Sequence, residues 1–160
     1  MLDQKTTDEL KKGMRTLWFI WTAMFVSLGI YIRICYQLQN VMSVRMGQNF
    51  PYALLRNILL IAAAVSIGLS FFFRKYFKNA NLTKFTSPNR ALSTAGVPLA
   101  KYYSAVLISL ALAESVGIYG FVLFLLKKDF DSLYLFMTIS AITMIIHRPK
   151  IEELEKIAEK

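Results

Sequence analysis

The sequence predicts an all-α, polytopic membrane protein with four transmembrane helices, and three observations support this fold class. Of the 160 residues, 56% are hydrophobic and 14% are aromatic, which is too apolar for a small soluble domain with a polar surface. The apolar residues gather in four blocks, each close to the roughly 18 to 25 residues that a spanning helix needs. The segments between the blocks are polar and mostly basic. The whole chain, 1–160, is therefore predicted to form a single transmembrane domain.

The four blocks give the predicted spans in chain order, and the polar segments give the connections. The spans are residues 17–36, 53–73, 102–126 and 130–147. The long connection 74–101 is rich in Asn, Ser and Thr and contains two prolines, so it is predicted to be irregular. In the tail 148–160, apolar residues recur on one helical face after Pro149, which predicts a short amphipathic helix lying on the lipid headgroups.

The distribution of Lys and Arg predicts the orientation. The formal net charge is +9, and the basic residues concentrate in residues 1–16, in 74–101 and in 148–160. An even number of spans places these three segments on one side, which the positive-inside rule identifies as the cytoplasm. We therefore expect cytoplasmic N- and C-termini in a multi-pass protein of the inner (cytoplasmic) membrane. Since the basic residues do not follow one face with stacking aromatics, the expected partner is the lipid bilayer and not nucleic acid.

The third predicted span carries a stripe of small residues that is typical of a helix–helix interface. Four small residues recur at every fourth position: Ala105, Ser109, Ala113 and Gly117. Small residues at this spacing allow a second helix to approach closely. The second span offers a matching surface, with Ala62, Ser66 and Ser70 at the same spacing and Ala64 and Gly68 beside them. We therefore expect spans two and three to form a tight hairpin.

A single acidic residue, Glu114, lies near the middle of the third span. A charged side chain at this depth costs roughly 2.5 to 3.5 kcal/mol on insertion scales, so we expect a protonated carboxyl with hydrogen-bond partners. Candidate partners at similar depth are the side chains of Ser27, Ser66, Thr138 and Ser140 and the backbone carbonyls beside Gly117. If Glu114 instead binds and releases a proton or Na⁺, the expected site consists of Glu114, Ser66 and Tyr119.

The stretch ALAESVGIYGFVLFLL, residues 111–126, resembles the carboxylate helix of the proteolipid, or c, subunits of rotary ATPases. In that family a mid-membrane acid is followed by IYG or a similar element, and the resemblance implies an ion-binding role for Glu114. Four-helix proteolipids, however, carry the acid in the last span and have a glycine-rich inner helix. The second span here contains only Gly68. The C-terminal half is also similar to small uncharacterised bacterial four-helix membrane proteins with a basic, proline-containing exit like HRPK, which implies no activity.

Three functions are compatible with these patterns. The favoured hypothesis is a structural or assembly subunit of a larger membrane complex, whose partners are other membrane proteins or copies of itself. The alternatives are a proteolipid-like protein that handles protons or Na⁺ through Glu114, and a small transporter. The sequence contains no Ser/His/Asp set, no metal-ligand spacing and no phosphate-binding loop, so no enzyme activity, metal or cofactor is expected. His147, the only histidine, lies at the predicted membrane exit and is interpreted as an interfacial residue.

Overall fold

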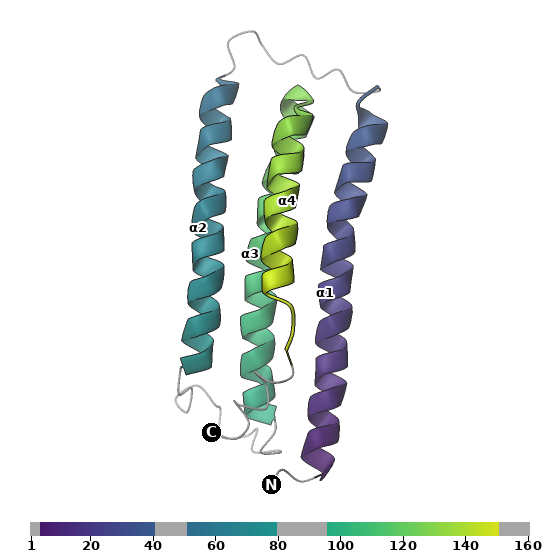
Figure 1. Ribbon diagram of the computed structural model, residues 1–160, viewed down its shortest axis with the longest axis vertical. Coiled ribbons are helices and arrows are strands. Elements are labelled where there is room, and N and C mark those ends of the chain that lie inside the picture. Colours follow the sequence, from purple (N-terminus) through teal and green to yellow (C-terminus); the bar gives the residue numbers. More distant parts are fainter. Residues whose placement is uncertain (1–3, 41–50, 80–95, 151–160) are drawn as a thin grey trace.

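The computed structural model is a bundle of four helices that run alternately up and down (Figure 1). It describes residues 4–40, 51–79 and 96–150. The helices are α1 (Gln4–Leu38), α2 (Tyr52–Asn79), α3 (Gly96–Lys127) and α4 (Phe130–Ile146). The predicted all-α class and the four predicted helices are confirmed.

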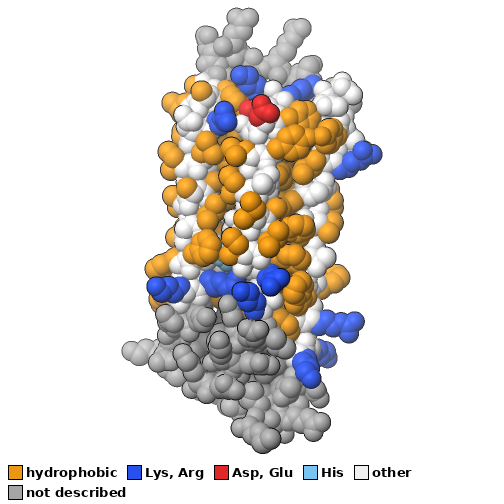
Figure 2. Space-filling view, in the orientation of Figure 1, with side chains coloured by type: hydrophobic (Ala, Val, Ile, Leu, Met, Phe, Trp, Pro, Cys, Tyr) orange, Lys and Arg blue, Asp and Glu red, His pale blue; other side chains and the backbone are white. Residues whose placement is uncertain are grey.

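Three of the four helices are long and apolar enough to cross a membrane, over Lys11–Leu38, Tyr52–Tyr76 and Tyr102–Lys127. The fourth, α4, is apolar but has only 17 residues, so it is about 26 Å long, slightly less than the ~30 Å hydrocarbon core. Figure 2 shows an apolar band across the visible face of the bundle, with Lys and Arg side chains at both edges of the band. This pattern is that of a membrane-embedded protein.

The helices extend beyond several predicted boundaries. Residues 74–79 continue α2 and residues 96–101 begin α3, so helix occupies both ends of the predicted connection 74–101. Pro98 lies in the first turn of α3. Backbone N–H groups in the first turn have no partner within the helix, so the missing N–H of proline costs no hydrogen bond. In the predicted tail, residues 148–150 are not helical, and 151–160 lie outside the described residues, as do 80–95.

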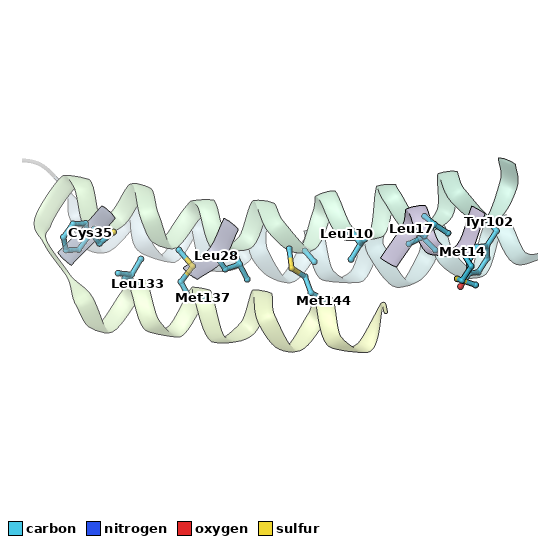
Figure 3. Close-up of a cluster of buried hydrophobic side chains, with 12 residues drawn as sticks. Met14, Leu17, Leu28, Cys35, Tyr102, Leu110, Leu133, Met137 and Met144 are labelled. Carbon is cyan, nitrogen blue, oxygen red and sulfur yellow. The ribbon is translucent and has the colours of Figure 1, made fainter. Parts of the chain in front are cut away.

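The central helix of the bundle is α3. It packs most extensively against α2 and α4, whereas α1 contacts α3 more than it contacts α4. One buried cluster joins α1, α3 and α4, and Figure 3 shows side chains such as Leu28, Leu110 and Met137 pointing into it. A second cluster, around Ala63 and Val116, joins α2, α3 and α4. Both α3 and α4 contribute to the two clusters, and α3 lies between α1 and α2 (Figure 1).

Hydrogen bonds between helices close one end of the bundle, where the C-terminal end of α4 emerges. The Tyr102 hydroxyl of α3 lies 2.9 Å from the Lys150 carbonyl oxygen and 2.7 Å from the Lys150 backbone nitrogen. The Tyr103 hydroxyl donates to the Gly13 carbonyl oxygen of α1. These contacts hold the start of α1, the start of α3 and the exit of α4 together at this end.

At the other end of the bundle, Asp129 caps α4. Its carboxylate accepts hydrogen bonds from the Ser132 backbone nitrogen (3.1 Å), the Ser132 hydroxyl (2.7 Å) and the Tyr52 hydroxyl of α2 (2.6 Å). Partial burial by itself raises the pKa of Asp129, but the hydrogen bonds from Tyr52 and Ser132 outweigh it and lower the pKa to about 2. An ionised N-cap thus joins the short α3–α4 turn to α2.

Candidate functional site

Glu114 lies on the side of α3 that faces α1, and its side chain is half-buried. Its Oε1 is 2.7 Å from the Ser27 hydroxyl oxygen and 3.3 Å from the Tyr31 hydroxyl oxygen, both on α1. Ser27 and Tyr31 are four positions apart and therefore share one face of α1. The carboxyl group thus supplies a polar link between the peripheral helix and the central one.

The Ser27 hydroxyl lies between two acceptors, the Glu114 carboxyl of α3 and a backbone carbonyl of its own helix. The Ser27 oxygen is also 2.6 Å from the Met24 carbonyl oxygen, and a hydroxyl has only one hydrogen to donate. Ser27 therefore donates its hydrogen either to Glu114 or to Met24, whereas Tyr31 donates to the same Glu114 oxygen. Oε1 of Glu114 is thus an acceptor within reach of two hydroxyl groups of α1.

The other two residues of the expected ion site lie elsewhere. The Ser66 hydroxyl donates to the Ala62 carbonyl oxygen within α2, at 2.9 Å. Tyr119 packs with the cluster that joins α2 to α3. Within the described ranges, no hydrogen bond joins either residue to Glu114. Sequence reasoning named Ser27 but missed Tyr31, although the Ser27–Tyr31 spacing on one helical face is a signal that points to it.

All four residues of the small-residue stripe are buried, and they serve two neighbouring helices. The Ser109 hydroxyl donates to the Ser70 carbonyl oxygen of α2, at 3.2 Å. The Ala113 carbonyl oxygen accepts from the Ser140 hydroxyl of α4, at 2.6 Å. At Gly117 the nearest atoms belong to α1 and α4. The stripe thus faces α2 near one end of α3 and turns toward α4 and α1 further along.

His147 is fully buried, although the sequence placed it at an interface. Its Nδ1 is 2.9 Å from the Thr143 carbonyl oxygen, and its Nε2 is 2.9 Å from the Ser70 hydroxyl of α2. Since a carbonyl only accepts, Nδ1 carries a proton, and in the neutral ring Nε2 accepts from Ser70. The Phe71 ring packs edge-on against the imidazole, with centroids 4.7 Å apart. His147 thereby ties the C-terminal cap of α4 to α2.

No cluster of three or more His, Cys, Asp or Glu side chains able to hold a metal ion occurs in residues 4–40, 51–79 and 96–150. Comparison of the chain with models of protein families, with curated proteins and with solved structures found no match. Glu114, with its two hydroxyl partners, is therefore the candidate site that the geometry itself defines.

Proposed function

We propose that this protein is a structural or assembly subunit of a larger complex in the inner membrane, with both termini in the cytoplasm. The polar groups at membrane depth support this function, because they join the helices to one another. Glu114 links α3 to α1, Ser140 links α4 to α3, and His147 links α4 to α2. Interhelical hydrogen bonds of this kind stabilise a rigid membrane unit.

The observation that carries the proposal is an open small-residue face on α2. Ala64 and Gly68 are four positions apart and both exposed, and a Cβ built at Gly68 would meet no atom within 4 Å. Two small residues at this spacing form a surface against which another membrane helix packs closely. Here that surface points away from the bundle, so a helix of another subunit, or of a second copy, is the expected occupant.

Substitution of Gly68 tests this assignment. Purified in a mild detergent, the wild-type protein is expected to carry a stoichiometric membrane-protein partner or to form a defined oligomer. Gly68→Leu should lose this association by at least about tenfold while folding normally, because the added side chain separates the facing helices and its Cβ meets no atom of its own bundle within 4 Å. Gly29→Leu is the matched control, since Gly29 is also open but lies on α1. A monomeric wild type without partners, or a Gly68→Leu variant that keeps its partner, would contradict the proposal.

The proposed orientation rests on the basic segments 1–16, 74–101 and 148–160. The start of α1, the end of α2 and the start of α3 lie at the same end of the bundle (Figure 1). Impermeant thiol labelling of intact cells tests it in a Cys35→Ala background, from which the only cysteine, which is buried, has been removed. Asn49→Cys should be labelled and Ser87→Cys should react only after the membrane is opened. The reverse pattern would place the termini outside.

A proton- or Na⁺-handling subunit is the second candidate function. The observation in its favour is the position of the Glu114 carboxyl, which has hydroxyl oxygens at 2.7 and 3.3 Å and remains half-buried. Intramembrane acids frequently mark ion pathways. Replacement of Glu114 by glutamine distinguishes the two functions, because glutamine cannot exchange a proton.

A further inference from the structure

A groove of about 670 Å³ runs along the outer surface of the bundle between α1 and α4. It follows α1 from Phe25 to Gln37, and Met137 and Ala141 of α4 form part of its other wall. The groove exists because α1 packs mainly on α3 and makes few contacts with α4. Its volume is in the range of ligand-binding pockets, about 300–1,000 Å³.

Gly29 makes this groove deeper on the α1 side. It lines the groove, and a Cβ at this position would meet no atom within 4 Å. On the same helix, the residues four positions before and after Gly29 are Phe25 and Arg33, which also line the groove. A closely packed partner helix needs small residues at those positions. The lining therefore favours a thin, flexible apolar occupant over another helix.

The groove carries a positive charge near one end. Arg33 lines it and is exposed, and within the described part of the chain this guanidinium makes no hydrogen bond or ion pair. It lies on the last turns of the α1 span, which ends at Leu38, so its long side chain reaches toward the headgroup level. A guanidinium at this level attracts a phosphate and hydrogen-bonds it in a forked geometry.

The dimensions fit one leaflet of a bilayer. From Phe25 to Gln37 the groove is about 18 Å long at the helical rise, against a leaflet depth of roughly 15 Å, half of the hydrocarbon core. The charged end lies toward the membrane surface and the apolar end toward its centre. An amphipathic molecule with an anionic head and an acyl tail matches the groove, because its head would lie at the charged end and its tail along the apolar part.

We propose that the α1–α4 groove binds one anionic phospholipid, with its phosphate on Arg33 and one acyl chain along Gly29 and Met137. The lipid covers the apolar surface that the sparse α1–α4 contact leaves open. It thereby helps to hold α1 against the bundle. This site is independent of the Ala64–Gly68 surface, which lies on α2.

Native mass spectrometry of the full-length protein tests the site with an equimolar mixture of phosphatidylglycerol and phosphatidylcholine. The wild type is expected to retain one phosphatidylglycerol in preference to phosphatidylcholine. Arg33→Gln should reduce this preference about fivefold, as expected for one basic residue near the membrane surface. Gly29→Leu should abolish retention of both lipids, because the leucine fills the groove.

The control is Ala23→Leu, which enlarges an exposed residue of α1 outside the groove lining and should leave lipid retention unchanged. Thermal melting of Gly29→Leu in detergent alone should match the wild type, because a Cβ at Gly29 meets no atom within 4 Å and the rest of the side chain extends into the open groove. Retention of lipid by a folded Gly29→Leu variant would overturn the proposal. Equal retention of the two lipids by the wild type would also overturn it. A third contrary result would be that the wild type forms a dimer which the Gly29→Leu substitution alone disrupts.

Discussion

Gly120→Ala is expected to destabilise the bundle by roughly 1 to 3 kcal/mol, the range for overpacking a tight core. A Cβ at Gly120 would lie 2.7 Å from the Cβ of Phe136 and 3.2 Å from the carbonyl oxygen of Leu133, both on α4. Neither atom can rotate away, because one is backbone and the other is fixed to it. The substitution therefore pushes α4 off α3, although Gly→Ala in a helix is ordinarily favourable by about 1 kcal/mol.

Gly117→Ala is the matched control for this prediction. The closest atom to a Cβ at Gly117 is the Cδ2 of Leu28, at 2.6 Å, and this methyl group ends a flexible side chain that can turn aside. Unfolding in the same detergent, followed by circular dichroism, should show a clear loss of stability for Gly120→Ala and a much smaller one for Gly117→Ala. Equal stability of the two variants would show that α3 and α4 do not approach closely at Gly120.

Glu114→Leu is expected to loosen α1 from the bundle. It removes the hydrogen bonds to Ser27 and Tyr31, while Glu114→Gln keeps a donor and an acceptor of similar reach. Each interhelical hydrogen bond in a membrane contributes about 0.6 kcal/mol on average and up to about 1.7. Unfolding measurements should therefore rank the wild type and Glu114→Gln close together, with Glu114→Leu below them. A double-mutant cycle of Glu114→Leu with Tyr31→Phe should give a coupling free energy of unfolding similar to that of one such hydrogen bond.

The same variants separate a structural carboxyl from an ion-handling one. In proteoliposomes with an internal pH dye, the structural role predicts that neither the wild type nor Glu114→Gln carries protons. If Glu114 exchanges a proton with water, the wild type should dissipate a pH gradient and a folded Glu114→Gln variant should not. That second result would overturn the structural assignment of Glu114, since glutamine cannot titrate.

The sequence by itself determined the fold class and the approximate positions of the four helices. Blocks of apolar residues must be helical in a bilayer, because each helix satisfies its own backbone hydrogen bonds there. The burial of Ala105, Ser109, Ala113 and Gly117 also followed from their spacing. Helix ends were less predictable: the polar residues of 74–79 continue α2, because a helix does not have to stop where its hydrophobicity does.

Only the tertiary structure decided which residues meet across helices. Periodicity shows which residues share a face of one helix, but the choice of neighbour depends on how the helices cross and how deep each one lies. For this reason Glu114 meets Tyr31 and Ser27 of α1 and not Ser66 or Tyr119. Of Gly117 and Gly120 on α3, the one that comes closer to α4 is Gly120, which lies outside the stripe. His147 is buried against Ser70 because α4 ends beside α2, a position that no local pattern specifies.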